Sequence, residues 1–162
     1  RLESGVLAMT PKRHGIQQLL DAASAQAAPG AEAKAITLTV EPTDLTARFD
    51  PKWTAEALYN LVDNAVKYTP AGGAVTLRAV GYELFCRVDV TDTGPGIPES
   101  EQARIFQRFY RSPSASEAEG VGIGLYLARQ IAAGQGGYLK VSSRPGEGST
   151  FSLFLPRAEE RT

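Results

Sequence analysis

The chain has 162 residues, 43% of them hydrophobic, and its 17 Lys and Arg against 18 Asp and Glu give a formal net charge of -1. This length and composition predict one globular domain with a packed core, and the balanced charge excludes a whole-domain electrostatic footprint for DNA or RNA. No apolar run approaches the roughly 20 residues that cross a bilayer, and a chain that starts at Arg1 without methionine is expected to be a piece of a longer protein.

The first elements predicted are helical. Residues 1–10 are expected to be the end of a preceding helix and a linker, because the residue before Pro11 is pushed out of the helical region. From Lys12 onward, apolar residues at i, i+3, i+4 and i+7 predict an amphipathic helix that ends at Pro29-Gly30. His14 is the only histidine and has no acidic neighbour, so a solvated or capping role is favoured over a role as a base.

Two β-rich runs and a capped helix follow. Residues 36–40 and 45–50 predict strands that could form a hairpin. Asp50-Pro51 supplies an N-cap and a proline at the first helical position, so a helix is expected from there to about Tyr68. At about 100° per residue, its polar side chains fall in one arc of about 140°, opposite an apolar face that packs. The arc contains Glu56, Asn60, Asp63, Asn64, Lys67 and Tyr68.

Part of this arc predicts a site for magnesium carried on a nucleotide. Mg²⁺ prefers near-octahedral oxygen ligands and takes most of its negative charge from substrate phosphates, so an asparagine amide oxygen is a suitable protein ligand. Asn60 and Asn64 are one helical turn apart, and Lys67 follows three residues later to meet phosphate charge. Either asparagine alone could be a plain surface residue. With Lys67 and Tyr68 in phase, the binding role is favoured.

The next strands lead to a carboxylate in a buried row. Residues 75–80 and 84–91 predict strands, and alternation on the second puts three apolar side chains and then Asp92 on one face. A buried carboxylate needs a donor, and the exocyclic amine of adenine is one. Gly94 and Gly96 lack the Cβ atoms that would keep the backbone away from a base. The alternative is a simple β-turn, since Asp-x-Gly-Pro-Gly is also turn chemistry.

A glycine-rich run precedes the last predicted helix. Residues 99–110 read as a helix, and Arg108 or Arg111 could neutralise a terminal phosphate. The small, polar residues 112–119 predict a mobile lid. Gly120-Val121-Gly122-Ile123-Gly124 comes directly before a helix expected over 122–133, so its free amides and the helix dipole could receive a polyphosphate. Two final strands are expected at 138–143 and 149–155, joined by a turn at 144–146.

Taken in chain order, these motifs resemble the catalytic and ATP-binding domain of two-component sensor histidine kinases, within the superfamily of gyrase, Hsp chaperone, histidine kinase and MutL ATPases. The match covers nearly the whole chain. Its asparagine box, first glycine box, phenylalanine box, second glycine box and closing glycine motif are residues 60–68, 92–96, 105–110, 120–124 and 146–150. On this basis residues 1–10 end a dimerisation helix, 11–157 form the catalytic domain with a lid at about 94–122, and 158–162 are a charged tail.

The resemblance implies a two-layer α/β sandwich of the Bergerat type, a mixed sheet covered by helices on one face, with ATP and Mg²⁺ as cofactors. It implies catalytic roles for Asn60, Lys67 and Arg111, with Asn64 on Mg²⁺ and Asp92 on adenine. The full set of implied nucleotide-binding residues is Asn60, Asn64, Lys67, Tyr68, Asp92, Gly94, Gly96, Ile97, Arg108, Gly120, Val121, Gly122, Ile123, Gly124, Leu125 and Thr150. Val121 stands where the family often has threonine or serine, so a hydroxyl contact to phosphate is absent.

The implied reaction is transfer of the γ-phosphoryl group of ATP to a histidine on a separate dimerisation and phosphotransfer domain. A response regulator would act downstream, with no nucleic acid partner. The domain is expected to be a monomer on its own and part of a homodimer in the full-length protein, on the cytoplasmic side of an inner-membrane sensor. Two alternatives stay open. One is a water-activating ATPase or serine kinase, whose base is a glutamate matching Asn60 and for which Glu56 could substitute. The other is a non-catalytic, nucleotide-gated interaction module.

Overall fold

The structure is a computed structural model, and it describes residues 8–107 and 123–157. The strands in this part of the chain are β1 (Lys12–Gly15), β2 (Thr37–Val40), β3 (Thr46–Phe49), β4 (Ala74–Gly81), β5 (Phe85–Asp92), β6 (Tyr138–Ser143) and β7 (Ser149–Pro156). The helices are α1 (Ile16–Ala33), α2 (Pro51–Tyr68), α3 (Glu99–Gln102) and α4 (Ile123–Gly134). None of the helices among the described residues is both long and apolar enough to cross a membrane.

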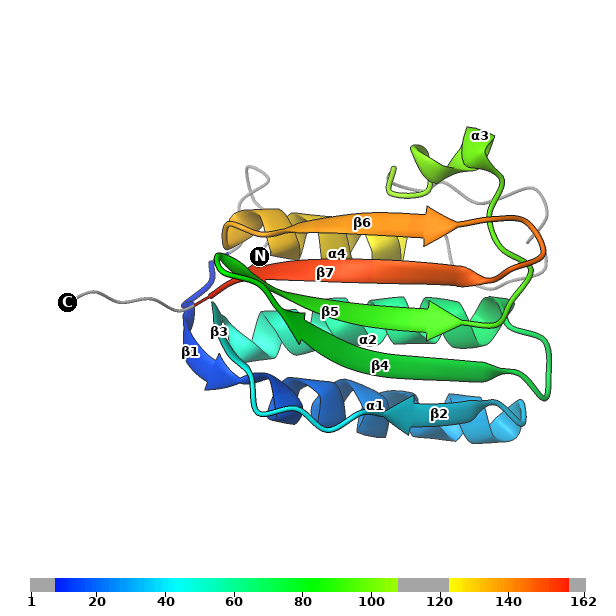
Figure 1. Cartoon of the computed structure of the whole chain (residues 1–162), viewed down its shortest axis with the longest axis horizontal. Helices are drawn as coiled ribbons and strands as arrows, with labels where there is room; N and C mark the ends of the chain where they lie inside the picture. The colour runs from blue at the N-terminus through cyan, green and yellow to red at the C-terminus, as the bar shows by residue number, and fades with distance from the viewer. Residues whose placement is uncertain (1–7, 108–122, 158–162) are drawn as a thin grey trace.

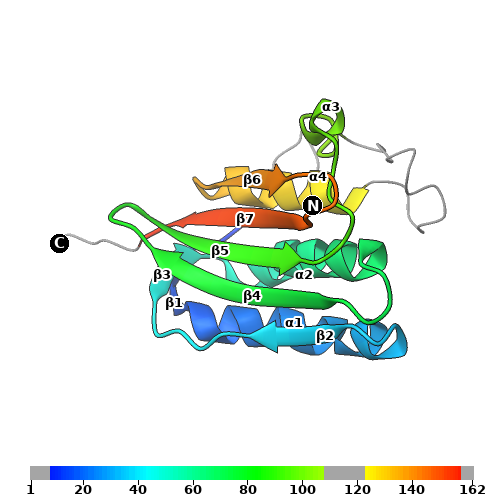
Figure 2. The ribbon, with the colours of Figure 1, turned by 45° about the vertical axis from the view of Figure 1, so that its right-hand side comes forward.

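The main sheet has five strands in the order β2-β4-β5-β7-β6. Strand β2 pairs parallel with β4, and the other neighbours pair antiparallel, so the sheet is mixed. Helices α1, α2 and α4 lie side by side on one face of this sheet, and the other face has no helix over it among the described residues (Figures 1 and 2). The predicted two-layer α/β sandwich is therefore confirmed.

The core lies between the helix layer and the sheet. Alternation along β5 and β7 sends the side chains of Val88, Val90, Phe151 and Leu153 into it, each at most 1% exposed. Helix α2 runs through the middle of the helix layer, in contact with both α1 and α4, and its fully buried Leu61 belongs to the apolar face that the sequence predicted. Burying one such leucine contributes about 1.5–3 kcal/mol, so this face fixes which side of α2 is left for polar residues.

Helix α2 begins as predicted. Asp50 is its N-cap and accepts a hydrogen bond from the Trp53 amide at 3.0 Å, with Pro51 in the first turn. The other Asp50 carboxylate oxygen accepts from the Thr10 amide at 2.7 Å. Burial opposes ionisation of this group, but the backbone amides of Thr10, Trp53 and Lys52 lower its pKa below the ordinary value. At the far end, the Lys34 ammonium donates to the last carbonyls of the helix.

The helix predicted from Lys12 to Pro29-Gly30 differs from the structure at both ends. Lys12 to Gly15 form strand β1 instead, paired with β3, and α1 starts at Ile16. At its other end α1 continues through Pro29 to Ala33. The packing of Ala31, which is 2% exposed, keeps the last turn against the core. Burial of this face thus outweighs the local preference of proline to end a helix.

The predicted hairpin of residues 36–40 and 45–50 is wrong. Strand β2 pairs with β4 and β3 pairs with β1. The connection between them does not fold back, because the Glu41 amide continues the β2–β4 pairing to Leu77 while the Leu45 carbonyl accepts from Ile16 at the start of α1. The two strands therefore belong to different sheets.

The helix predicted over residues 99–110 is shorter than expected. Helix α3 ends at Gln102, and turns follow up to Gln107, after which the chain lies outside the described residues. Ile105 and Phe106 are buried, and the Phe106 ring meets Phe151 edge-on at 6.1 Å. Insertion of two adjacent apolar side chains into the core favours tight turns here over a regular helix.

Candidate functional site

The polar arc of α2 is flanked by glycines from two other segments. Asn60 and Asn64 are half-buried and Lys67 is exposed, in agreement with the predicted orientation. A Cβ added to Gly124, in the first turn of α4, would lie 3.6–3.7 Å from atoms of the Asn60 side chain. A Cβ on Gly94 would come within 3.0 Å of the Tyr68 carbonyl oxygen. The arc from Asn60 to Tyr68 therefore has the start of α4 at one end and the loop after β5 at the other.

Lys67 has a partner within its own helix. Its ammonium lies 3.2 Å from Asp63 Oδ2, and the two side chains are 39% and 34% exposed. An exposed pair of this i, i+4 type contributes only about 0.3–0.5 kcal/mol. The ammonium can therefore leave Asp63 for a stronger anion such as a phosphate at little cost.

Asp92 is a buried carboxylate at the end of β5, as the alternation predicted. It is 8% exposed, and its Oδ1 accepts from the Gly94 amide at 2.8 Å. Burial raises the pKa of Asp92, and the backbone amides of Gly94 and Ser149 oppose the rise. The group is thus an acceptor in an apolar setting that favours a neutral donor such as an amine.

Glycines are required around this carboxylate. Gly94 already lies so close that a Cβ would be 3.0 Å from Asp92 Oδ1. Gly148 has φ +81°, and a Cβ there would collide with the Asp92 carbonyl group. Gly96 has φ +82°, and a Cβ there would collide with the Arg144 carbonyl group. The loop after β5 and the turn between β6 and β7 are therefore packed backbone on backbone, which only glycine permits.

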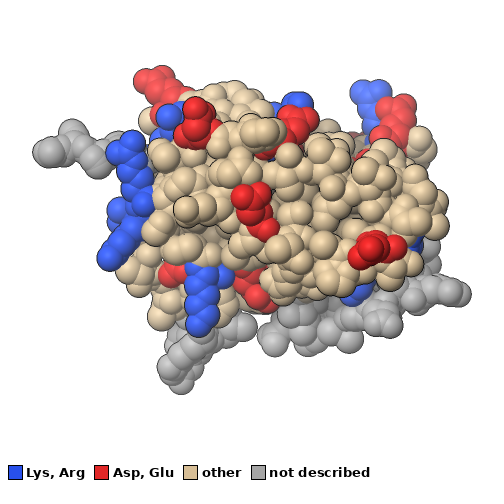
Figure 3. All heavy atoms as spheres, turned by 90° about the horizontal axis from the view of Figure 1, so that it is seen from below, with Lys and Arg blue, Asp and Glu red and all other residues tan. Residues whose placement is uncertain are grey.

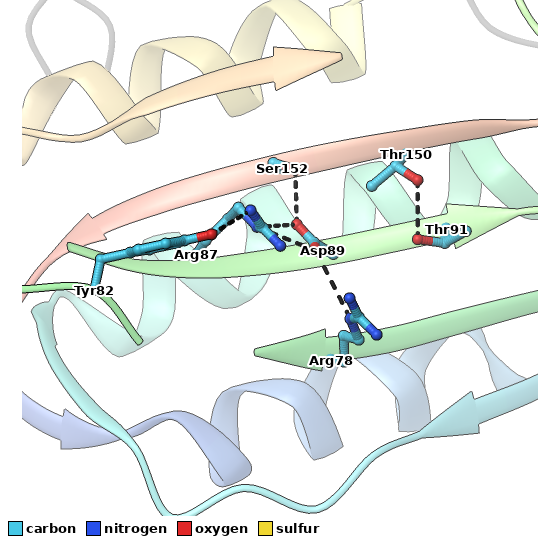
Figure 4. Close-up of polar contacts among 7 residues, drawn as sticks. All are labelled: Arg78, Tyr82, Arg87, Asp89, Thr91, Thr150 and Ser152. Atoms are coloured by element: carbon cyan, nitrogen blue, oxygen red, sulfur yellow. Dashed lines mark hydrogen bonds and ion pairs between the residues drawn. The ribbon is translucent and has the colours of Figure 1, made fainter. Parts of the chain in front are cut away.

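Thr150 does not join this set. The register pairs it with Thr91, whose hydroxyl lies 3.1 Å from its own, on the face of the sheet away from the helices (Figure 4). Its neighbour Ser149 pairs with Asp92 and is 6% exposed. The Ser149 backbone amide is one of the two that counter the rise in the pKa of Asp92. The sequence held a signal for this, because counting back by two from buried Phe151 reaches Ser149 and not Thr150.

The open face of the sheet carries a separate polar network. Asp89, 3% exposed, accepts from Ser152 Oγ at 2.7 Å and from Arg87 Nε at 2.9 Å, with Arg78 3.9 Å away. The Arg87 guanidinium also donates to the Tyr82 hydroxyl at 2.6 Å. Figure 4 shows these side chains in front of the sheet, with the helices behind it. This network satisfies a buried charge and lies on the opposite side from α2.

Basic and acidic side chains both appear on the underside of the molecule (Figure 3). On the face shown in Figure 3, the described Lys and Arg side chains and the Asp and Glu side chains are scattered among uncharged residues. His14 lies in β1, half-buried, with its ring 5.4 Å from that of Phe49. Figure 1 places β1 at the opposite end of the molecule from the tip of β5.

Some predicted site residues lie outside the part of the chain that the structure describes. They are Arg108, Arg111 and residues 120–122, and residues 108–122 of the predicted lid lie outside it as well. Ile123 is the first residue of α4, and Leu125 is half-buried against the core. Ile97 is also half-buried and packed against the core, and both of its backbone polar groups are bonded to side chains.

The donor set suits magnesium only if the ion arrives with phosphates. No three His, Cys, Asp or Glu side chains gather into a metal site among the described residues. The amide oxygens of Asn60 and Asn64 are neutral ligands, which fit an ion that takes its negative charge from a nucleotide and keeps water.

Comparison with known proteins gives consistent matches. The profile of the family described as histidine kinase-, DNA gyrase B-, and HSP90-like ATPase matches residues 49–159. The adaptive-response sensory kinase SasA of Synechococcus sp. (strain JA-3-3Ab) is 42% identical over 131 residues, which are 79% of this chain and 35% of that protein. The sensor protein DivL of Caulobacter vibrioides is 36% identical over 162 residues, 99% of this chain and 20% of that protein. The chain thus spans about a third or less of these two relatives.

Solved structures match over the same length. Full-length ShkA in complex with AMPPNP has a TM-score of 0.85 and 29% identity, covering 100% of this chain and 34% of that one. The mycobacterial sensor histidine kinase MprB has a TM-score of 0.79 and 27% identity, covering 93% of this chain and 100% of that one.

Proposed function

The chain belongs to the histidine kinase-, DNA gyrase B-, and HSP90-like ATPase family, and from this premise we propose that it is the ATP-binding catalytic domain of a sensor histidine kinase. The observation that carries the proposal is that the polar arc of α2, from Asn60 to Tyr68, lies between two glycine segments. The arc has Gly124 against Asn60 at one end and, at the other, the Gly94 loop that also contacts the buried carboxylate of Asp92. The relatives named as sensory kinases support the same reading.

The Asp92 end of the arc suits the adenine of ATP, and the Gly124 end suits its phosphates. Asp92 would accept a hydrogen bond from the exocyclic amine of adenine, and Tyr68 would lie beside the nucleotide. Asn64 would be the protein ligand of Mg²⁺, which when bound neutralises charge on the phosphates. Asn60 and Lys67 would contact phosphate, together with the amides at the start of α4, where a helix N-terminus favours anions. From the sequence motifs we propose Arg111 for the γ-phosphate.

The acceptor would be a histidine on a separate domain. Phosphoryl transfer depends mainly on positioning and on charge stabilisation, which this chain supplies in Asn60, Lys67 and Arg111. A hydrolytic reaction would instead need a general base close to the phosphates. Asn60, which lies beside Gly124 at the start of α4, cannot take a proton, and Glu56, the alternative base, lies one turn further away on α2. These features favour transfer over hydrolysis.

The wider setting follows from the same proposal. We propose that the phosphotransfer domain belongs to the same full-length kinase, that this kinase is a homodimer anchored in the inner membrane, and that a response regulator receives the phosphoryl group. Residues 11–157 would be the catalytic domain.

The test uses γ-labelled ATP with three mixtures: the chain alone, the chain with its own histidine-bearing domain, and the chain with that domain after its histidine is changed to alanine. We expect label only on the intact histidine-bearing domain. Label on the chain itself that is lost in His14→Ala would refute the proposal. Steady phosphate release that is lost in Glu56→Gln would favour the ATPase instead.

A further inference from the structure

The loop that follows Asp92 is fastened to the turn between β6 and β7. The Gly146 amide donates to the Pro95 carbonyl at 2.6 Å. The Ile97 amide donates to Ser143 Oγ at 2.7 Å. Gly96 packs under the Arg144 carbonyl so closely that no side chain fits. The first residues of the predicted lid are therefore fixed at their base.

Ser143 is the centre of this fastening. Its Oγ has three partners: the Ile97 amide, the Gly148 carbonyl at 2.9 Å and the Ser149 hydroxyl at 2.8 Å. A hydroxyl has one proton and two lone pairs. All three bonds form only if Ser143 donates to Gly148 and accepts from both Ile97 and Ser149. The Ser143 hydroxyl is then fully used, and it carries no free capacity for water.

Gln102 completes the hold on Ile97. Its side-chain amide donates to the Ile97 carbonyl at 2.8 Å and to the Ser143 carbonyl at 3.0 Å. The Ile97 amide and carbonyl are thus both held by side chains, one from the end of β6 and one from α3. Such bonds fix the position of a residue that lies in a loop with no strand partner.

The same hydroxyl reaches the surroundings of Asp92. Gly148, whose carbonyl accepts from Ser143, packs on the Asp92 backbone, and Ser149 pairs with Asp92 and acts on its carboxylate. One side chain therefore connects Ile97 to the two residues that lie against the buried acceptor.

We infer that Ser143 is a positioning residue of the adenine end of the nucleotide site, fixing Ile97 relative to Asp92. This inference rests on the proposed function, since Ile97 is expected to contact the nucleotide. Without the hydroxyl, Ile97 would keep its hydrogen bond to Gln102 but would be less ordered before binding, and ordering it on binding would lower the affinity. An ordering cost of this kind corresponds to about three- to tenfold weaker binding.

The experiment compares Ser143→Ala with Ser142→Ala in the whole chain. Ser142 is the matched control, because it is the preceding residue of β6, is exposed, and pairs with Thr150 on the open face. Two quantities are measured: the ATP affinity with magnesium by calorimetry, and the exchange rate of the Ile97 amide by NMR in the absence of nucleotide. Ser143→Thr, which keeps the hydroxyl, and Gln102→Ala complete the set.

We expect Ser143→Ala to accelerate exchange at Ile97 and to weaken ATP binding about three- to tenfold, with Gln102→Ala changing both in the same direction. Ser142→Ala should match the wild type, and Ser143→Thr should restore slow exchange and affinity. If Ser143→Ala exchanges and binds as the wild type does, the inference is wrong while the proposed function stands. If the wild type itself does not bind ATP, the proposed function fails and the role of Ser143 in nucleotide binding fails with it. Slow exchange at Ile97 is independent of that outcome.

Discussion

Replacing Asp92 with asparagine separates adenine recognition from stability. The Gly94 amide, 2.8 Å from Oδ1, can still bond an asparagine oxygen, and a carboxylate with a raised pKa is removed from an apolar setting. The free energy of unfolding should therefore change by less than about 1 kcal/mol. ATP binding should suffer more, because an amide that turns its NH₂ toward the adenine amine leaves two donors unpaired. That costs about 1–3 kcal/mol, or roughly 5- to 150-fold in affinity.

Asp89 supplies the matched control on the same strand. It is also buried, but it faces the open side of the sheet, where it accepts from Arg87 and Ser152. Asp89→Asn removes the charge that both arginine side chains approach, and because Arg87 is 25% exposed, we expect a loss of about 1–3 kcal/mol of stability. Its ATP affinity should equal that of the wild type.

The assay pairs urea unfolding with calorimetric titration of ATP and GTP for the wild type and both variants. GTP presents a carbonyl where ATP presents the amine, so the wild type should prefer ATP and Asp92→Asn should reduce that preference. The assignment of Asp92 to adenine would be refuted if neither protein distinguished ATP from GTP and the substitution left the ATP affinity unchanged. It would also be refuted if Asp89→Asn lowered ATP affinity as much as Asp92→Asn did.

Two further predictions concern stability, and both are read from urea unfolding. Gly148→Ala should lower the free energy of unfolding more than Gly146→Ala does. Both glycines have a positive φ, which costs alanine about 1–2 kcal/mol. Only at Gly148 would the new Cβ also collide with Asp92, since nothing lies within 4 Å at Gly146. Equal losses would contradict the packing described around Asp92. Asp50→Ala should cost about 0.5–2 kcal/mol at pH 7 as a lost N-cap. Because the folded pKa of Asp50 is lowered below 3.8, its contribution is present above that pH and fades as the pH falls through the folded value. A deficit that stayed constant down to pH 2 would show that the carboxylate charge is not responsible.

Local patterns predicted those elements whose partners are close in sequence. The Asp50-Pro51 start of α2, its two faces, and the β6–β7 hairpin agree with the structure because capping, helical periodicity and turn chemistry act within a few residues. Strand pairing was harder. The parallel partner of β2 comes after the whole of α2, so nothing in residues 36–50 distinguishes it from a hairpin.

The same distinction between local patterns and tertiary contacts holds for the site residues. Periodicity predicts the α2 face that carries Asn60 and Asn64 and the buried position of Asp92, and the structure agrees. The glycine motif predicts Thr150 beside the nucleotide, whereas strand alternation from Phe151 puts Ser149, and not Thr150, next to Asp92. Ser143 and Gln102 carried no signal, since a serine at a strand end and an exposed-looking glutamine acquire meaning only when Ile97 is brought to them. Positioning residues of this kind depend on tertiary proximity.

The pairing of β5 with β7 has a consequence for how the protein folds. It joins Asp92 to Ser149 across a long stretch of chain that includes α3 and α4, whereas β4–β5 and β6–β7 are closed by short turns. Closing a long loop costs more entropy than closing a short one, so the two hairpins should form before they meet. The surroundings of Asp92 are then completed only when the hairpins join. Nucleotide binding would therefore report only those chains in which β5 and β7 have paired.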